Sequence, residues 1–414
     1  MINTTRMPMH RVVITGMGVV TPFGEGVAVM MKGLLDRKSC VKRMEGWEGI
    51  NGLRSFIAAP VGSVDEKRIP RQKRRTMGRM AIFSVLAADE AIRAAGLDSS
   101  KLDLDRAGVI AGSTMGSANN INEFFESYQA KKDISDISPM LFFKSMSNTA
   151  AINVAQYLGW RGYLLATSAA CASGLQAIGA GYHALKMGIQ DVIVCGGTEE
   201  LHSSVTGVFD LLFATSTNYN DNPEKSPRPF DSKRDGIVCG EGSGMMVLET
   251  LEHASARGAN ILAEIIGYTT CGGGDHVSQS SREAVSYCMT ASLKDAGLGR
   301  DDIDYISAHG TATIQGDAAE AEAIAGIFGD QVPVSSLKGH FGHTLGASGA
   351  IELVATVGMM QDGIIHPGIN LDSVASDCGG VNFIQEPFRR EVRTVMKNCF
   401  AFGGVNATLI CRKI

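Results

Sequence analysis

Cys171 has the sequence surroundings of a catalytic nucleophile. It lies in a run of small residues, Thr167 to Gly174, that leads directly into a helix-like segment ending at Met187. Small neighbours leave a sulfur uncovered, and the free N–H groups and dipole of a helix N-terminus stabilise a thiolate. The apolar spacing of the same segment also fits a buried helix with an inert cysteine. Two distant histidines in glycine-rich settings, His309 and His343, favour nucleophilic catalysis over that structural role.

Each histidine stands where an imidazole can face a cleft. His309 follows an expected strand over residues 303–308 and precedes a Gly-Thr-Ala-Thr run, although a hydrogen-bonded core histidine is the alternative. His343 precedes residues 344–349, a glycine-containing segment that begins another helix. The positive end of that helix disfavours the protonated ring. A neutral imidazole donates one hydrogen bond and accepts another, as the stabiliser of an oxyanion requires.

Three further features accompany these histidines. Lys338 lies five residues before His343, and Glu320 lies eleven residues after His309. Each of these charges, taken alone, is typical of a solvated surface. Residues 400–406 read Phe-Ala-Phe-Gly-Gly-Val-Asn, and their glycines suit a mobile loop or an exposed N–H donor.

The elements that must position these residues recur in two halves of the chain. The matching pairs are strand segments 11–18 and 261–268, strand segments 107–114 and 304–311, and alanine-rich helices 80–95 and 281–296. Each helix ends in Ala-Gly-Leu, a C-terminal stop signal. Short apolar strands alternating with helices predict an α/β fold with sheets covered on both faces. We expect an N-terminal half over 1–257, a C-terminal half over 258–414, and a long loop over 218–244.

Composition excludes several classes of protein. The 414 residues carry a net charge of −5, so nothing global suggests binding to nucleic acid or to a membrane surface. No apolar run approaches the roughly 20 residues of a membrane span. The nine cysteines are scattered without metal-ligand spacing, and residues 1–10 show no targeting signal. We therefore expect a cytoplasmic protein in a reducing compartment.

Together these motifs resemble the β-ketoacyl-acyl carrier protein synthases of the thiolase superfamily, most closely the elongating type I/II enzymes. The resemblance runs from residues 12–16 to residues 406–409 and includes the loop stretches 218–225 and 230–236. It implies a thiolase-like fold in which two similar halves build a five-layered α-β-α-β-α architecture. It also implies a decarboxylative Claisen condensation of malonyl thioester with an enzyme-bound acyl chain, in fatty acid or in specialised polyketide or polyene biosynthesis.

The resemblance assigns roles to the main site residues. Cys171 takes the acyl group from a phosphopantetheine thioester, which divides one difficult bond formation into two steps. His309 and His343 bind the malonyl thioester and promote its decarboxylation. The backbone N–H groups of Cys171 and Phe402 match an oxyanion hole for the acyl carbonyl. No metal and no organic cofactor is implied, because the phosphopantetheine arrives on the acyl carrier protein.

Supporting roles follow from the same resemblance. It implies that Lys338 and Glu320 support the site electrostatically and that Thr311 and Thr313 bind the pantetheine arm. It implies that Phe402 gates the site, with Phe400 beside the substrate. It also implies that Met115 gates the acyl pocket at a dimer interface.

A basic run matches the region of the family that docks the acidic carrier protein, although a solvated surface is the alternative. Its members are Lys67, Arg68, Arg71, Lys73, Arg74 and Arg75. The implied partners are an acyl carrier protein and either a second copy of this chain or a ketosynthase-like chain-length factor.

The chain departs from the family pattern close to the site. Ile314 replaces the usual proline after His-Gly-Thr-x-Thr, residues 339–341 read Gly-His-Phe, and Ala401 replaces a usual glycine. Alanine restricts positive φ, so we expect altered motion of the 400–406 loop. We interpret His340 as structural. These departures favour a specialised polyketide or polyene pathway over housekeeping fatty acid synthesis.

Three alternatives fit less well. A thiolase needs a second cysteine in a C-terminal Cys-x-Gly motif, and Cys399 lies in a different setting. The initiating synthases use Cys-His-Asn, whereas this chain has histidine at both later positions. A non-catalytic chain-length factor typically lacks the nucleophile, so Cys171 argues against it. The chain can still be the active half of a heterodimer.

Overall fold

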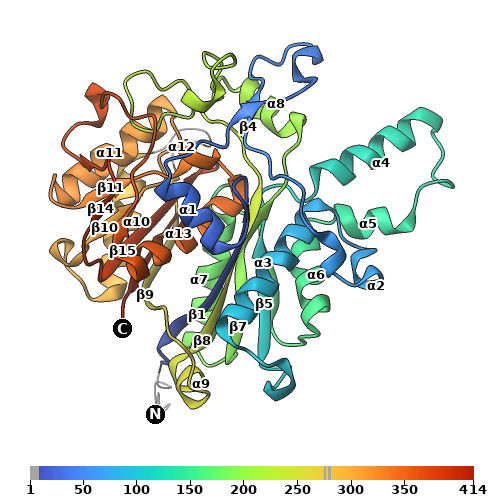
Figure 1. The fold of residues 1–414 in the computed structure, drawn as a ribbon, viewed down its shortest axis with the longest axis horizontal. Helices are drawn as coiled ribbons and strands as arrows, with labels where there is room; N and C mark the ends of the chain where they lie inside the picture. Colours follow the sequence, from blue (N-terminus) through green and yellow to red (C-terminus); the bar gives the residue numbers. More distant parts are fainter. Residues whose placement is uncertain (1–8, 275–276, 278–280) are drawn as a thin grey trace.

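The computed structural model describes residues 9–274, 277 and 281–414 (Figure 1). Its central feature is a 12-stranded mixed sheet in which the path β13-β11-β10-β15-β16-β9-β1-β8-β7-β5-β6 runs from one edge to the other, with β2 paired to β1. Strands β1 and β9 join the two halves through only three residue pairs, Val12–Ile14 against Ala263–Ile265. The sheet is therefore two similar sheets connected by a short seam.

The strands of the N-terminal half are β1 (Val12–Thr21), β2 (Gly24–Glu25), β5 (Ala107–Gly112), β6 (Leu164–Thr167), β7 (Val192–Glu199) and β8 (Gly242–Thr250). Those of the C-terminal half are β9 (Ala263–Gly272), β10 (Tyr305–Ser307), β11 (Pro333–Ser335), β13 (Asn382–Phe383), β15 (Thr394–Ala401) and β16 (Val405–Arg412). Two small pairs lie apart, β3 (Lys42–Arg43) with β4 (Ile57–Ala58) and β12 (Ile364–Ile365) with β14 (Phe388–Arg389).

The helices complete five layers (Figure 1). Helices α3 (Arg79–Ala95) and α6 (Thr149–Leu158) cover the outer face of the first half-sheet, and α10 (Arg282–Ala296) with α11 (Ile314–Phe328) covers the second. Helices α7 (Ser173–Lys186) and α13 (Ser348–Asp362) pack on each other and contact strands of both halves, so they form the middle layer. The predicted thiolase-like α-β-α-β-α architecture is confirmed.

The remaining helices are α1 (Val27–Leu35), α2 (Arg71–Arg74), α4 (Ala118–Lys131), α5 (Pro139–Ser145), α8 (Ser203–Leu211), α9 (Leu251–Ala256) and α12 (Lys338–Phe341).

The middle layer is dense because glycines let its helices approach. A Cβ at Gly174 in α7 would lie 2.7 Å from the carbonyl oxygen of Gly346, just before α13. A Cβ at Gly349 in α13 would lie 2.7 Å from the Cβ of Leu175 in α7. The N-terminal ends of the two helices therefore meet without intervening side chains, which brings the segments before them, with Cys171 and His343, into contact.

The internal repeat was correctly predicted. The helices expected at 80–95 and 281–296 are α3 and α10, and each ends at a glycine with left-handed φ, Gly96 at 63° and Gly297 at 67°. Two boundaries were wrong. The helix expected from Cys171 to Met187 is α7, which begins only at Ser173, and the loop expected over 218–244 ends where β8 begins at Gly242.

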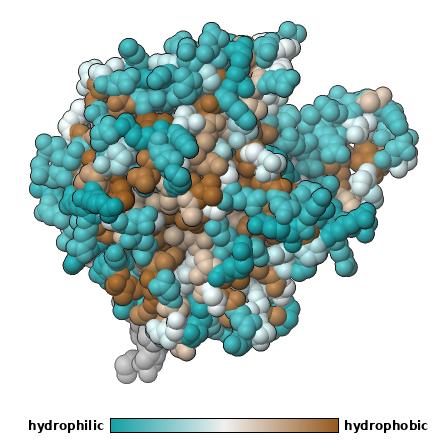
Figure 2. All heavy atoms as spheres, viewed as in Figure 1, coloured by the Kyte–Doolittle hydropathy of each residue, from teal (hydrophilic) through white to brown (hydrophobic). Residues whose placement is uncertain are grey.

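Helices α4 and α5 form an arm that projects from the layered body (Figure 1, right). Several of its apolar side chains are exposed, namely Phe125, Tyr128, Ile134, Phe142 and Phe143. Figure 2 shows brown, hydrophobic atoms on this arm within a largely hydrophilic surface. Among the residues that the structure describes, no helix is long and apolar enough to cross a membrane.

Candidate active site

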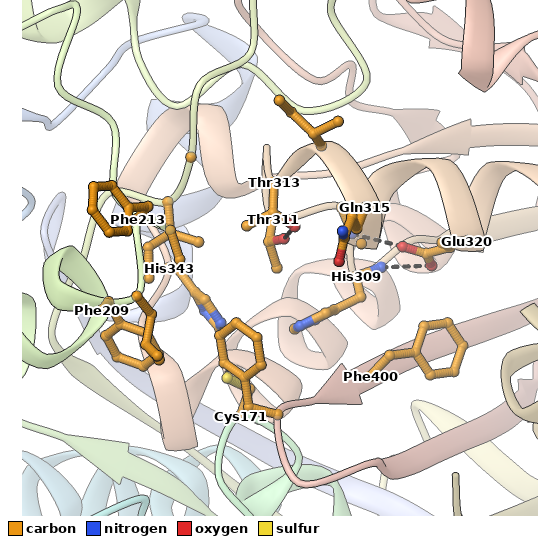
Figure 3. Close-up of a pocket in the computed structure, with 18 of the residues that line it drawn as sticks. Cys171, Phe209, Phe213, His309, Thr311, Thr313, Gln315, Glu320, His343 and Phe400 are labelled. Atoms are coloured by element: carbon orange, nitrogen blue, oxygen red, sulfur yellow. Dashed lines mark hydrogen bonds between the residues drawn. The ribbon is translucent and has the colours of Figure 1, made fainter. Parts of the chain in front are cut away.

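A cavity of about 340 Å³ collects most of the predicted catalytic and substrate-binding residues (Figure 3). Those in its wall are Cys171, His309, Thr311, Thr313, Glu320, His343, Phe400 and Phe402. They come from the segments before α7 and α13, the turn after β10, helix α11 and the end of β15. The structure thus joins side chains that the sequence separates by more than 200 residues.

Cys171 is presented by a sharp turn between β6 and α7. Ala170 adopts φ of 46°, a left-handed conformation that is strained for a residue with a side chain. The Ser173 hydroxyl holds this turn, accepting from the Ala169 N–H at 2.8 Å and donating to the Ala170 carbonyl at 2.6 Å. The thiol consequently stands at the cavity floor, with its sulfur 3.0 Å from His343 Nε2.

The resting state of Cys171 differs from the prediction. Burial raises the pKa of this thiol above its ordinary value, the nearby Cys399 thiol raises it further, and Lys338 opposes the shift. The prediction of a thiolate stabilised by the helix was wrong in direction. The helix begins two residues after the cysteine, and the desolvation of a fully buried sulfur outweighs its favourable field.

His343 is fixed as a hydrogen-bond donor toward the sulfur. The backbone N–H of Leu345 donates to its Nδ1 at 3.3 Å, and the Ser348 hydroxyl lies 2.8 Å from the same atom. A backbone N–H can only donate, so Nδ1 is unprotonated and Nε2 carries the hydrogen. Burial, followed by Lys338 and Lys397, holds the pKa of this imidazole well below its usual range. The predicted neutral ring is supported, but burial and two lysines are its main causes.

His309 is oriented in the same way. The ammonium of Lys338 lies 3.4 Å from Nδ1 and can only donate, which leaves the hydrogen on Nε2. That Nε2 is buried and has no hydrogen-bond partner in the part of the chain that the structure describes. The two imidazole rings meet edge to face, with centroids 5.2 Å apart. Burial, Lys338 and His343 hold the pKa of His309 well below its usual range.

Glu320 supports His309 through the backbone and not through Lys338. Its carboxylate accepts the backbone N–H groups of His309 at 2.8 Å and Gly310 at 2.7 Å, and the Asn398 side-chain amide at 3.2 Å. Burial raises the pKa of Glu320. It therefore holds the turn that carries His309, and its electrostatic support of the site stays a prediction.

Sequence reasoning missed the residues that do accompany Lys338. Lys338 donates to the Glu352 carboxylate at 2.6 Å and to the His309 carbonyl at 2.6 Å. A second lysine, Lys397, donates to the other oxygen of Glu352 at 2.5 Å. All three side chains are fully buried. One sequence feature could have revealed Glu352: it is the single carboxylate within the apolar segment 349–360.

Thr311 and Thr313 lie on the cavity wall, with their hydroxyl oxygens 2.9 Å apart. Ile314 begins α11 at the mouth of the cavity and is 62% exposed. Phe402 stacks on Phe209 of α8 with ring centroids 5.9 Å apart. These residues surround the route from the surface to the thiol.

The alanine in the 400–406 loop imposes no strain in this conformation. Ala401 ends β15, and the left-handed positions are Gly403 at φ 88° and Gly404 at φ 69°. An alanine at 401 therefore needs no positive φ here, and the predicted effect of Ala401 on loop motion stays a prediction.

Three other predictions lie outside the cavity wall. His340 has each ring nitrogen 3.0 Å from a backbone carbonyl, those of Lys38 and Pro367, and burial lowers its pKa to about 4, which fits a structural role. Met115 is 47% exposed beside the arm, so its gating role stays a prediction. The six basic residues lie in α2 or beside it; Lys67, Arg68, Arg71 and Arg75 are exposed, and Lys73 and Arg74 are half-buried.

Known proteins match this chain along nearly its whole length. Residues 9–254 match the family described as "Beta-ketoacyl synthase, N-terminal domain", and residues 262–372 match "Beta-ketoacyl synthase, C-terminal domain". The 3-oxoacyl-[acyl-carrier-protein] synthase 1 of Haemophilus influenzae is 36% identical over 407 residues, covering 98% of this chain and 99% of its own.

Solved structures of known ketosynthases have the same fold as this chain. A β-ketoacyl synthase from Burkholderia phymatum STM815 is 41% identical with a TM-score of 0.94, covering 98% of this chain and 100% of its own. A ketosynthase solved in complex with its type II polyketide acyl carrier protein is 30% identical with a TM-score of 0.88 and the same coverage. This chain belongs to the β-ketoacyl synthase family and is a condensing acyltransferase of fatty acid or polyketide biosynthesis.

Proposed function

We propose that Cys171, His309 and His343 perform the decarboxylative condensation of carrier-protein thioesters in this chain. The observation that carries the proposal is the convergence of one thiol and two imidazole Nε2–H donors in a single cavity. A thiol supplies the covalent attachment point, and two fixed donors suit an oxygen that becomes negative.

The reaction begins with acyl transfer. The Cys171 sulfur attacks the carbonyl of an acyl thioester and its proton goes to the departing phosphopantetheine sulfur, so one thioester is exchanged for another. The His343 N–H toward the sulfur stabilises the thiolate as it forms, which offsets the cost of ionising a buried thiol. The backbone N–H groups of Cys171 and Phe402 would receive the carbonyl oxygen of the intermediate.

Condensation follows on the same atoms. The malonyl thioester loses CO₂, and its electron pair forms an enolate whose oxygen accepts the two Nε2–H groups. The enolate carbon attacks the Cys171 thioester, the C–S bond breaks, and the departing Cys171 thiolate takes one proton from solvent water. The product is a 3-oxoacyl thioester two carbons longer.

We propose that this chemistry uses no resident metal. The sulfur and imidazole nitrogens of Cys171, His309 and His343 lie within 4.8 Å of one another, a distance that would suit a metal ion. However, an imidazole nitrogen that binds a metal must be unprotonated, whereas the donors to both Nδ1 atoms place the hydrogens on Nε2. The cluster is thus prepared for an oxyanion and not for a cation.

Acyl transfer to the isolated protein tests the proposal. The protein is incubated with acyl carrier proteins bearing acyl chains of increasing length, and intact mass is measured before and after malonyl carrier protein is added. We expect one acyl mass on the Cys171 peptide, then CO₂ and a 3-oxoacyl product. A protein that accepts no acyl group from this series contradicts the proposal. Saturated products indicate lipid synthesis, whereas exclusive use of unsaturated or aryl primers indicates a specialised pathway.

We further propose that the carrier protein docks on the basic surface around α2, defined by the six residues named above. Ion pairs with Glu25 and Glu66 engage Arg68 and Arg74, and Lys73 donates to the Tyr157 carbonyl. Lys67, Arg71 and Arg75 are exposed on the same short segment. A local positive surface on a chain of net charge −5 fits an acidic partner.

Charge reversal checks this docking surface. We expect Lys67→Glu with Arg71→Glu to raise the KM for acyl carrier protein by about tenfold at low salt, with a smaller effect at high salt. The kcat with a small pantetheine thioester should not change. Lys294→Glu, an exposed reversal on α10, is the matched control. If Lys294→Glu raised the KM as much as Lys67→Glu with Arg71→Glu does, the carrier protein would dock on another surface.

A second ketosynthase subunit is the proposed occupant of the sheet edge formed by β6. Strand β6 ends the sheet with Leu164 exposed, and the arm beside it carries exposed aromatics. A second copy of this chain is the proposal, and a chain-length-factor partner is the alternative. Light scattering of the purified chain separates a dimer from a monomer that needs a different subunit.

We propose the cytoplasm as the compartment of this protein. The nine free cysteines support this proposal, because thiols stay reduced there.

A further inference from the structure

Two lysines share one carboxylate beneath the active site. Glu352 lies in α13, and its two oxygens receive the ammonium groups of Lys338 at 2.6 Å and Lys397 at 2.5 Å. Both lysines and the glutamate are fully buried. Because burial of an ion is costly unless it is paired, one lysine would suffice to neutralise Glu352. Lys397 is therefore a second buried cation that the neutralisation of Glu352 does not require.

The extra ammonium is bound to the backbone that carries His309. Lys397 donates to the carbonyl oxygens of Ala308 at 3.2 Å and Ser307 at 3.4 Å, and Lys338 donates to that of His309 at 2.6 Å. Three successive carbonyls at the end of β10 thus face two ammonium groups. This arrangement fixes the path of the chain as it enters the catalytic turn.

The cluster also determines the electrostatic field at the imidazoles. The charged or titratable groups that face them are Lys338 from α12, Glu352 from α13, Glu320 from α11, Lys397 and Cys399 from β15, and Cys171. Lys338 and Lys397 each lower the pKa of both His309 and His343. With Glu352 ionised, the two lysines and this glutamate together carry one positive charge beside the rings, and Glu320 is the other carboxyl group that faces them.

We propose that Lys397 is a positioning residue for the condensation: its ammonium anchors the 307–308 backbone that leads into His309, and its charge keeps both imidazoles neutral as Nε2–H donors. The proposal rests on the condensing function proposed above. Without Lys397 the Lys338–Glu352 pair is neutral, and a protonated imidazole becomes easier to form as the malonyl carboxylate enters the cavity. A protonated His309 would also repel the Lys338 ammonium that orients it.

Three variants change the cluster charge in steps. Lys397→Met keeps the length of the side chain and gives a charge of zero, Glu352→Gln gives +2, and the double variant restores +1. The titration of His309 and His343 is followed by ¹⁵N NMR in each variant, without substrate. Substitution of single histidines assigns the signals.

We expect the imidazole pKa values to rise by about one to three units in Lys397→Met, to stay low in Glu352→Gln, and to return toward the native values in the double variant. The acid limb of malonyl decarboxylation should move to higher pH only in Lys397→Met. Lys397→Gln, which retains an N–H donor without the charge, should shift the titration as methionine does. Lys397→Gln also tests the proposal if Lys397→Met does not fold.

Unchanged imidazole titration in Lys397→Met or Lys397→Gln overturns the proposal, as does a double variant that titrates like Lys397→Met alone. A purely structural lysine would reduce stability without this dependence on charge. Because the titration requires no turnover, its result is separate from the acyl-transfer test. A native protein that takes no acyl group would refute the condensing function, while the titration would still report on the cluster.

Discussion

Replacing Cys171 with alanine is expected to abolish acyl-enzyme formation and to lower condensation by roughly 10⁴-fold or more. The thiol is the sole sulfur in the cavity wall among the described residues, and its turn directs it at the two imidazoles. Decarboxylation of malonyl carrier protein should remain measurable, because the two Nε2–H donors that stabilise the enolate do not depend on the sulfur. Intact mass and CO₂ release check the two halves of this prediction.

The matched control is Cys195→Ala. Cys195 is also a fully buried thiol whose pKa is raised by burial, but it lies within β7 and outside the cavity wall. It should retain acylation and condensation after any loss of stability is taken into account. Condensation that survives in Cys171→Ala would mean that another group carries the acyl chain, and the assigned mechanism would fail.

The sequence indicated the three residues that the structure brings together in the cavity, because each lies beside glycine or other small residues. Cys171 stands among small side chains, and His309 and His343 each adjoin a glycine that shapes a turn. The repeat of strands and helices was equally readable, since hydrophobic periodicity and Ala-Gly-Leu stops are local signals. The layered fold follows from those elements.

Properties that depend on contacts between the two halves of the folded chain could not be predicted from the sequence. The pKa of Cys171 is raised because its sulfur is completely buried, which no local pattern reveals. Lys338 looks like a surface charge in the sequence, yet it lies fully buried against Glu352. Lys397 sits in the middle of an apolar strand, and only the packing of β15 against α13 shows why a charge is tolerated there. The bonds from the His309 and Gly310 N–H groups to Glu320 likewise could not be predicted, because they form only in the folded turn.

Removing either imidazole is expected to cost about 10²- to 10³-fold in malonyl decarboxylation, the typical effect of deleting one donor to a developing oxyanion. We expect this for His343→Ala and His309→Ala in the Cys171→Ala background, which isolates decarboxylation from acyl transfer. The loss should appear in kcat more than in KM, because the enolate oxygen carries more negative charge than the ground-state carbonyl. CO₂ release from malonyl carrier protein measures both constants.

His340→Gln is the control that separates position from residue type. His340 is as deeply buried as the other two histidines, but its ring nitrogens face the carbonyls of Lys38 and Pro367, and glutamine retains N–H donors for them. It should decarboxylate at the native rate. Equal losses in all three variants would point to general destabilisation, whereas losses confined to His309 and His343 require that their free Nε2–H groups meet the substrate. Since both donors serve one oxygen, removing them together should cost less than the product of the single losses.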